Sequence, residues 1–253
     1  MQPVVRNQLL LGGLAVLLAC ATSTTVAAPQ EHIPVRHDWK QTFKQPYFFK
    51  EEGIPYFEYF GNTLPSQEFI RLSPSLHGMK GAIWAKEPNQ HEEWIVEFSV
   101  NVFGRHLHGG DGLAFWYAKD RGQLGPVYGS KDSWEGLMVA LDTYDKRDAR
   151  ANTFVLGMLN HNNFEYAKAE HPMSHILSGC FREYRNLKEP LNVRVMYANE
   201  TVTVSVDNIN SGENYQPCFE AEHVKLPTGY YFGVSAASSH DEADDHDILS
   251  FDT

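Results

Sequence analysis

Two segments of the chain place carboxylates where they could bind a small polar ligand. Residues 108–112 read His-Gly-Gly-Asp-Gly, so Asp111 stands between glycines. Glycine admits backbone conformations that other residues avoid, and it lets a ligand approach the main chain closely. Residues 141–148 carry Asp142, Asp145 and Asp148 directly after an apolar run. Carboxylates with a backbone carbonyl between them correspond to half of an oxygen-ligand calcium site. A plain Gly-Asp turn and a solvated charged turn are the structural alternatives.

The densest polar segment is residues 239–247, which combines histidines with acids. Its spacing matches no zinc signature. We therefore expect a loop that hydrogen-bonds to its own backbone. His106 and His108 lie on a segment predicted to be extended and would face the same side, but no third ligand accompanies them. The sequence thus predicts no transition-metal site.

Composition narrows the classes of protein that can present these segments. The chain has 253 residues, with 21 Lys and Arg against 32 Asp and Glu, which gives a net charge of −11. Without a Lys/Arg-rich stripe, it lacks the electrostatic footprint of a nucleic-acid-binding protein. Hydrophobic residues make up 42% and aromatic residues 13%. These proportions exclude a disordered tail, a coiled-coil rod and a collagenous repeat, and they favour one large β domain.

The N-terminal residues resemble a secretory signal peptide. Leu9–Leu18 is almost entirely apolar but is too short to span a bilayer, which takes about 20 residues. Small residues follow and end in Val26-Ala27-Ala28, a plausible cleavage site. We therefore predict a signal peptide over residues 1–28 and a mature domain over residues 29–253. An N-terminal membrane anchor and a lipoprotein signal with lipidated Cys20 are the alternatives.

Secretion changes how the cysteines are interpreted. Removal of Cys20 leaves Cys180 and Cys218, a pair 38 residues apart in an oxidising compartment, and we expect one disulfide rather than two buried thiols. The segment Asn199-Glu200-Thr201 is an N-glycosylation acceptor motif. Alternating runs at 191–197 and 201–206 flank it, so the motif is expected near a hairpin turn.

The elements that must position these segments are strands. Trp94–Val102 alternates apolar and polar residues, which is typical of a half-buried strand. Residues 113–117 and 137–141 are short continuous apolar runs that suit strands buried on both faces. Residues 230–236 and 248–251 complete the set, and no sustained helical stripe or internal repeat is found. The predicted fold is all-β, a single antiparallel β-sandwich. Its last strand reads as cut short, as in a fragment of a longer chain.

Several ordered motifs resemble one family, the L-type (legume-like) lectin domains of ERGIC-53-like and fungal Emp46/Emp47-like cargo receptors of the early secretory pathway. The resemblance runs from about His37 to the last residue. The motifs that carry it include Gly109–Tyr117, Gly125–Ser130, Pro74–Leu76, Gly81–Trp84, Leu141–Tyr144, Cys180–Asn186, Phe232–Ala237 and Asp244–Phe251.

The resemblance implies a concanavalin-like jelly roll that binds high-mannose N-glycans on glycoproteins and carries them from the endoplasmic reticulum toward the Golgi. Asp111 matches the aspartate that accepts hydrogen bonds from sugar hydroxyls, after a cis peptide bond that would be Gly110–Asp111. Cys180 and Cys218 match the family disulfide. The implied location is the lumen of the early secretory pathway. Membrane attachment and oligomer formation would come from a C-terminal region outside these residues.

The chain departs from the family at the metal and sugar positions. Calcium-dependent members read Asp-x-aromatic-x-Asn after the strand; Asp142 and Tyr144 fit this pattern, but the Asn position is Lys146. In the later segment Tyr-Asp-His-x-x-Asp, the sugar-binding His becomes Lys168 and the metal-binding Asp becomes His171. The candidate sugar-binding residues are therefore Gly110, Asp111, Lys146 and Lys168, and the candidate metal ligands are Asp142 and Tyr144.

Smaller departures affect other sugar contacts. A family Ser near the first strands falls at Gly78, and a late Gly-Gly pair falls within residues 237–240, which read Ala-Ser-Ser-His.

These departures predict lost or altered calcium dependence. Calcium takes 6–8 oxygen ligands and accepts no ammonium among them. Our hypothesis is that the Lys146 ammonium pairs with Asp142 and partly replaces the metal. A weaker site for calcium or a monovalent cation through Glu170 or Asp145 remains the alternative, and no cofactor is otherwise expected.

Two other functions compete with sugar binding. A divergent domain that binds protein rather than sugar is the main alternative. A glycoside hydrolase on the same kind of sandwich needs two carboxylates about 5–5.5 Å apart. The chain contains no Glu-x-Asp-x-x-Glu pattern, and Glu97 is the only acid within Trp94–Val102. We therefore do not expect an enzyme.

Overall fold

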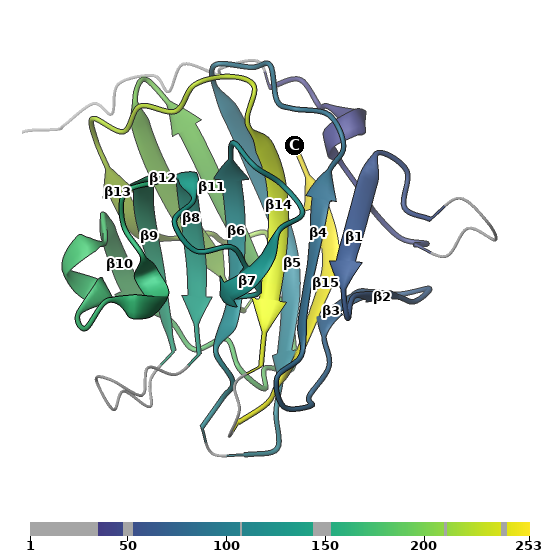
Figure 1. Cartoon of the computed structure of the whole chain (residues 1–253). Coiled ribbons are helices and arrows are strands. Elements are labelled where there is room, and N and C mark those ends of the chain that lie inside the picture. Colours follow the sequence, from purple (N-terminus) through teal and green to yellow (C-terminus); the bar gives the residue numbers. More distant parts are fainter. Residues whose placement is uncertain (1–34, 48–52, 107, 144–152, 210–211, 239–241) are drawn as a thin grey trace, which may run out of the picture. The chain divides into compact units, whose positions relative to one another are not determined.

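Two seven-stranded antiparallel sheets pack face to face in the computed structural model (Figure 1). The structure describes residues 35–47, 53–106, 108–143, 153–209, 212–238 and 242–253, and the fold is that of the unit His37–Thr253. The front sheet has the order β1 (Phe57–Gly61), β4 (Lys80–Ala85), β14 (Tyr231–Ala237), β6 (Gly112–Ala118), β8 (Glu135–Asp142), β9 (Phe154–His161), β10 (Ser178–Phe181).

The back sheet has the order β13 (Gln216–Ala221), β12 (Thr201–Asp207), β11 (Leu191–Ala198), β5 (Trp94–Phe103), β15 (Asp245–Asp252), β3 (Ile70–Ser73), β2 (Leu64–Pro65). Outside the sheets lie the short strand β7 (Leu124–Val127) and the 3₁₀ turns η1 (Trp39–Gln41), η2 (Tyr166–Lys168) and η3 (Pro172–His175). No helix in the part of the chain that the structure describes is long and apolar enough to cross a membrane. This arrangement confirms the predicted antiparallel β-sandwich.

The period-two pattern of β5 shows how the sequence builds the core. Val96, Phe98 and Val100 are buried between the sheets, while Glu97 and Ser99 point to the outer face of the back sheet. Strands β6 and β8 are instead buried along almost their whole length. Their continuous apolar runs are explained because both faces of the front sheet are covered, which the sequence predicted for central strands.

The back sheet covers the inner face of the front sheet, and a separate apolar layer covers its outer face. Trp84, Trp116 and Trp134 are each 1% exposed or less and pack with Tyr128 and Tyr166. The Trp116 indole donates to Ser235 Oγ at 2.7 Å, and Ser235 Oγ donates to the Tyr128 carbonyl at 2.6 Å. The segment around β7 and the turn η2 therefore lie over the sheet as a fixed layer rather than as free loops.

Two local predictions are confirmed. The β11–β12 hairpin turns at Asn199 and Glu200, whose φ angles of 51° and 56° suit a tight hairpin turn. Cys180 on β10 and Cys218 on β13 form a disulfide with a Cα–Cα distance of 5.3 Å. It joins an edge strand of the front sheet to an edge strand of the back sheet.

The predicted signal peptide, residues 1–28, lies outside the described residues. The last strand, β15, runs through Asp252 and pairs with both β5 and β3 near the middle of the back sheet.

Candidate functional site

Strand register brings the predicted ligand-binding segments to one end of the sandwich. Gly112, the first residue of β6, lies opposite Asp142 at the end of β8 and opposite Ala237 at the end of β14. The Gly-Gly-Asp-Gly loop therefore adjoins the end of β8 and the end of β14. These elements meet at the lower end of the view in Figure 1. We call this end, with Asp111 at its centre, the candidate site.

The loop that carries Asp111 is fixed through its backbone. The Thr143 N–H donates to the Asp111 carbonyl at 3.3 Å, and the Gly110 N–H donates to Asp244 Oδ2 at 3.2 Å. Gly112 has a φ of +123°, and a Cβ there would overlap the Leu141 carbonyl. Only glycine fits this approach of two strands, so the motif is required by the backbone as well as by any ligand.

The expected cis bond at Gly110–Asp111 is wrong. Among the described residues the one cis peptide bond is Gln45–Pro46, and Gly110–Asp111 is trans. A non-proline cis bond is unfavourable by about 3–4 kcal/mol. The loop reaches its position without one, because its flanking glycines and the Asp244 contact direct the chain.

Buried acids from the β14–β15 connection form the other side of the site. Asp244 is fully buried, and it accepts from Arg185 Nε at 2.9 Å on Oδ2 and from Arg185 Nη2 at 2.8 Å on Oδ1. His246 is also fully buried, and among the described residues neither of its ring nitrogens has a partner within hydrogen-bond geometry. Burial lowers the pKa of His246 to about 4, although the neighbouring carboxylates of Asp244 and Asp245 oppose that change. The imidazole is therefore neutral at neutral pH.

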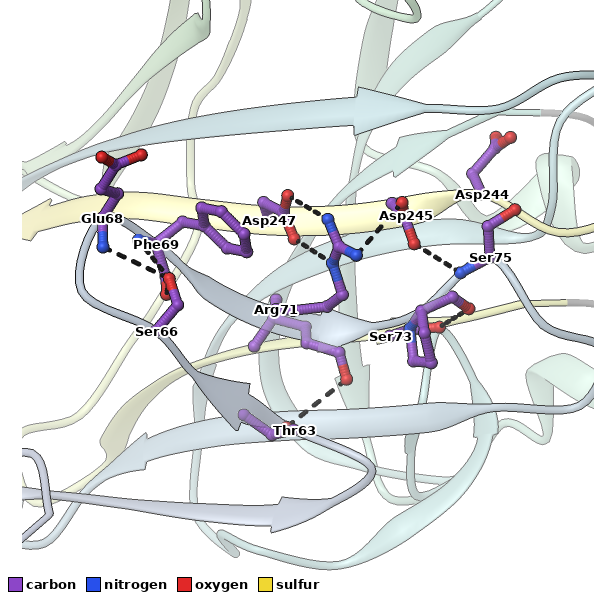
Figure 2. Close-up of polar contacts among 12 residues, drawn as sticks. Thr63, Ser66, Glu68, Phe69, Arg71, Ser73, Ser75, Asp244, Asp245 and Asp247 are labelled. Carbon is purple, nitrogen blue, oxygen red and sulfur yellow. Dashed lines mark hydrogen bonds and ion pairs between the residues drawn. The ribbon is translucent and has the colours of Figure 1, made fainter. Parts of the chain in front are cut away.

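The expectation that residues 239–247 bond to their own backbone is wrong for the carboxylates of Asp244, Asp245 and Asp247. Asp247 forms a two-bond pair with Arg71 of β3, at 2.7 and 2.9 Å (Figure 2). Asp245 lies 3.3 Å from the same guanidinium and accepts the Ser75 N–H at 2.6 Å. These acids bind side chains and backbone from other parts of the chain. The local composition carried no signal for this, since the partners are distant in the sequence.

The structure describes two of the predicted metal positions, Asp142 and His171. Asp142 is 6% exposed at the end of β8, while Tyr144 and Lys146 lie outside the described residues. His171 is exposed and precedes η3, where its carbonyl accepts the Ser174 N–H at 3.1 Å. Within the described part of the chain, no three His, Cys, Asp or Glu side chains are grouped to hold a metal ion. With lysine and histidine at two ligand positions, this donor set does not fit calcium.

Lys168 is presented at the surface by an ordered turn. The Asp132 carboxylate accepts the Tyr166 and Ala167 N–H groups at 2.7 and 3.1 Å, and the Tyr166 hydroxyl meets the Tyr128 hydroxyl at 3.1 Å. The Lys168 ammonium pairs with Glu165 at 2.8 Å, and its side chain is 74% exposed. The hydrogen bond to Glu165 raises the pKa of Lys168, so the group is a cation at neutral pH.

Three further residues singled out in the sequence are Glu97, His106 and Asn199. Glu97, the acid considered for hydrolysis, pairs with Arg194 at 2.5 Å on the outer face of the back sheet. His106 lies 3.8 Å from Glu242 across two connections. Asn199 is exposed at its hairpin, at the end of the sandwich opposite the candidate site, because β11 pairs Tyr197 with Trp94 at the start of β5.

Known proteins of one family are similar to this chain over most of its length. Residues 35–253 match the model of the legume-like lectin family. The chain is 34% identical to protein ERGIC-53 of Mus musculus over 235 residues, which cover 91% of this chain and 45% of that protein. It is 32% identical to the vesicular integral-membrane protein VIP36 of Homo sapiens over 242 residues, covering 94% of this chain and 66% of the relative. The chain thus spans about half the length of its ERGIC-53 relatives.

The fold agrees with a solved structure of one of these relatives. The lumenal domain of VIP36, in a form with bound Ca²⁺ and mannose, superposes with a TM-score of 0.80 at 31% identity, covering 86% of this chain and 90% of that domain. Family match, relatives and fold coincide over the same residues. The chain belongs to the legume-like lectin family.

Proposed function

We propose that this domain binds high-mannose N-glycans on glycoproteins and serves as the lumenal, cargo-binding part of a receptor in the early secretory pathway. The observation that carries the proposal is the register at Gly112, which places Asp111 between the ends of β8 and β14. A similar domain, that of VIP36, has been solved with mannose bound. Asp111 and the Gly110 backbone are the proposed sugar contacts, and Lys146 and Lys168 take positions that in the family belong to Asn and His.

We further propose that sugar binding needs no calcium. Asp142 would require further oxygen ligands around the ion, and the chain offers Lys146 and His171 instead. A lysine ammonium beside Asp142 supplies positive charge without a metal. The backbone bonds of Asp111 and Gly110 to Thr143 and Asp244 then hold the loop.

Binding of an immobilised high-mannose N-glycan by the full chain, produced in a secreting eukaryotic host, tests the first proposal. We expect binding that D111A abolishes. D120A is the matched control, because Asp120 follows the other end of β6 and its side chain is 45% exposed in a surface pair with Lys131. Binding that survives D111A, or no binding by the wild-type chain, contradicts the proposal.

Restoring the family residues tests the second proposal. The K146N/H171D variant returns an amide and a carboxylate to the metal positions, so we expect it to bind calcium and to become sensitive to a chelator. The wild-type chain should show neither property in calorimetry. Micromolar calcium affinity in the wild-type chain would overturn the proposal.

A domain that binds protein and no longer binds sugar is the second candidate. The observation that favours it is Lys168, which pairs with Glu165 at the surface where the family has a sugar-binding histidine. The absence of any signal for the wild-type chain on an array of high-mannose glycans would support this function.

The remaining proposals concern the whole protein. We propose attachment to the membrane through a C-terminal region, assembly into homo- or hetero-oligomers, and a lumenal location in the endoplasmic reticulum, the intermediate compartment or the Golgi. A single sugar site that binds at millimolar strength supplies about −4 kcal/mol, and several linked sites supply avidity.

We also propose that Asn199 carries a glycan. The side chain is exposed at the turn between β11 and β12, far along the strands from Asp111, so a glycan there leaves the candidate site open. Loss of a glycosidase-sensitive mass in N199Q tests this, and an unchanged mass contradicts it.

A further inference from the structure

The segment Tyr184-Arg185-Asn186, between β10 and β11, touches the connections that surround the candidate site. The Tyr184 hydroxyl meets Thr143 Oγ1 at 3.3 Å, after the end of β8. Asn186 exchanges two hydrogen bonds with the backbone of Gly104, after the end of β5, at 2.9 and 3.0 Å. Arg185 binds Asp244, before β15, through two hydrogen bonds at 2.9 and 2.8 Å. Residues 184–186 therefore connect the residues that follow β8 and β5 with the residue that precedes β15.

Asp244 is the point at which these contacts reach the sugar-binding loop. Its carboxylate is fully buried, the Arg185 side chain is 11% exposed, and Oδ2 also accepts the Gly110 N–H at 3.2 Å. Gly110 immediately precedes Asp111. A buried carboxylate that is held by a guanidinium fork and aimed at a backbone N–H fixes direction as well as distance, because the fork admits one planar arrangement.

We propose that Arg185 and Asp244 are positioning residues for the sugar site, which hold the Asp111 loop in its binding conformation in the absence of a metal. The proposal rests on the proposed function, because it assigns the organising role that calcium would otherwise have. The 184–186 segment acts through Asp244 and Gly110 and does not itself need to touch sugar.

Packing around the ion pair supports this role. A Cβ at Gly104 would overlap Asp244 Oδ1 and Arg185 Nη2, and a Cβ at Gly109 would lie 2.6 Å from Asp244 Oδ2. The backbone at Gly104 and Gly109 therefore lies directly against the pair.

A neighbouring ion pair supplies a matched control. Asp247 of β15 forms a two-bond pair with Arg71 of similar geometry, at 2.7 and 2.9 Å. Figure 2 shows Asp244 standing apart from the group of Arg71, Asp245 and Asp247. Among the described residues, the Asp247 carboxylate binds Arg71 and forms no hydrogen bond with the 104–112 segment, so its loss should lower stability without releasing the loop.

The experiment compares D244N, R185K and D247N in the full chain. Amide hydrogen exchange is measured without sugar at residues 104–112, and binding to a high-mannose glycan is measured in chelator. We expect D244N to speed exchange in the loop at least tenfold and to weaken binding at least tenfold. R185K, which keeps the charge but loses the fork, should have a smaller effect in the same direction. D247N should change both quantities less than twofold.

Each result decides the proposal. Unchanged loop exchange in D244N overturns it, as does equal loop opening in D247N, because either result reduces the Asp244 pair to a general contribution to stability. If D244N is not secreted, R185K with D247N decides in the same way. Wild-type protein that binds no sugar while D244N still opens the loop would overturn the proposed function and support the bracing of the loop.

Discussion

Two Arg–Asp pairs of nearly the same geometry lie at the start of β15, and they differ in what surrounds them: Asp244 immediately precedes the strand, and Asp247 lies within it. Arg185–Asp244 has contacts of 2.8 and 2.9 Å, and Arg71–Asp247 has contacts of 2.7 and 2.9 Å. The first pair is closed off, with side-chain exposures of 11% and 0%, whereas the second has 29% and 7%. Among the described residues, only the Asp244 carboxylate has a third donor, the Gly110 N–H from the predicted sugar-binding loop.

The comparison shows that pair geometry alone does not reveal a functional role. Burial raises the pKa of the Asp247 carboxyl even though Arg71 opposes that change. The cost of burying the charge therefore offsets most of what this structural pair contributes to stability. The Asp244 pair has similar chemistry but is packed against the main chain of the candidate site. Its partners make it a candidate for positioning.

The largest expected effect comes from displacing the buried Arg185–Asp244 pair without changing a charge. In G104A the new Cβ would overlap both Asp244 Oδ1 and Arg185 Nη2. Separating a buried pair leaves uncompensated charges and typically lowers stability by about 3–5 kcal/mol. We expect a loss of that size in the free energy of unfolding, measured by urea denaturation, together with weakened glycan binding. Stability and binding equal to the wild type would show that the pair tolerates displacement.

An effect of intermediate size comes from His246, which lies between Asp244 and Asp247 on the strand. Its pKa is about 4 in the folded protein and about 6.5 when unfolded, so the unfolded chain binds more protons between these values. Stability from this group is complete above about pH 6.5 and is lost as pH falls through about 4, by about 3 kcal/mol in total. H246F should lack this part of the pH dependence of unfolding. A wild-type slope in H246F would assign the acid sensitivity to other groups.

The smallest expected effect comes from Gly78, in the connection between β3 and β4. Nothing lies within 4 Å of a Cβ built there, but its φ is +71°. G78A should therefore lower stability only by the strain of a left-handed residue, about 1–2 kcal/mol. Thermal unfolding beside G104A measures the difference. A loss in G78A as large as in G104A would mean that backbone strain, rather than the ion pair, dominates at this end.

Local patterns in the sequence predicted much of the fold. Alternation identified β5, β11 and β12, continuous apolar runs identified β6 and β8, and the paired cysteines were recognised. Strands β1 to β4, β9 and β13 were not singled out as strands. Their residues lack a long alternating run, and β3 and β4 pair with β15 and β14, which lie far along the chain. The apolar layer on the outer face of the front sheet was also missed, because its tryptophans come from separate strands and loops.

The sequence predicted which residue types lie at the site, but it did not predict the contacts that hold them together. The motif around Asp111 was found because glycines on both sides of an acid are a local signal. The Asp244 pair was not found, since 59 residues separate it from Arg185 and the segment was interpreted as a loop bonded to itself. The cis bond at Gly110–Asp111 was carried over from the family and is wrong here. Strand register and ion pairs between distant residues organise the site, and local sequence patterns encode neither.

The most direct test of the account is calorimetric titration of the full chain with a high-mannose glycan, before and after extensive treatment with chelator. The account predicts the same dissociation constant in both samples, because contacts within the chain hold the Asp111 loop. Loss of binding on chelation, with recovery when calcium is returned, would contradict it.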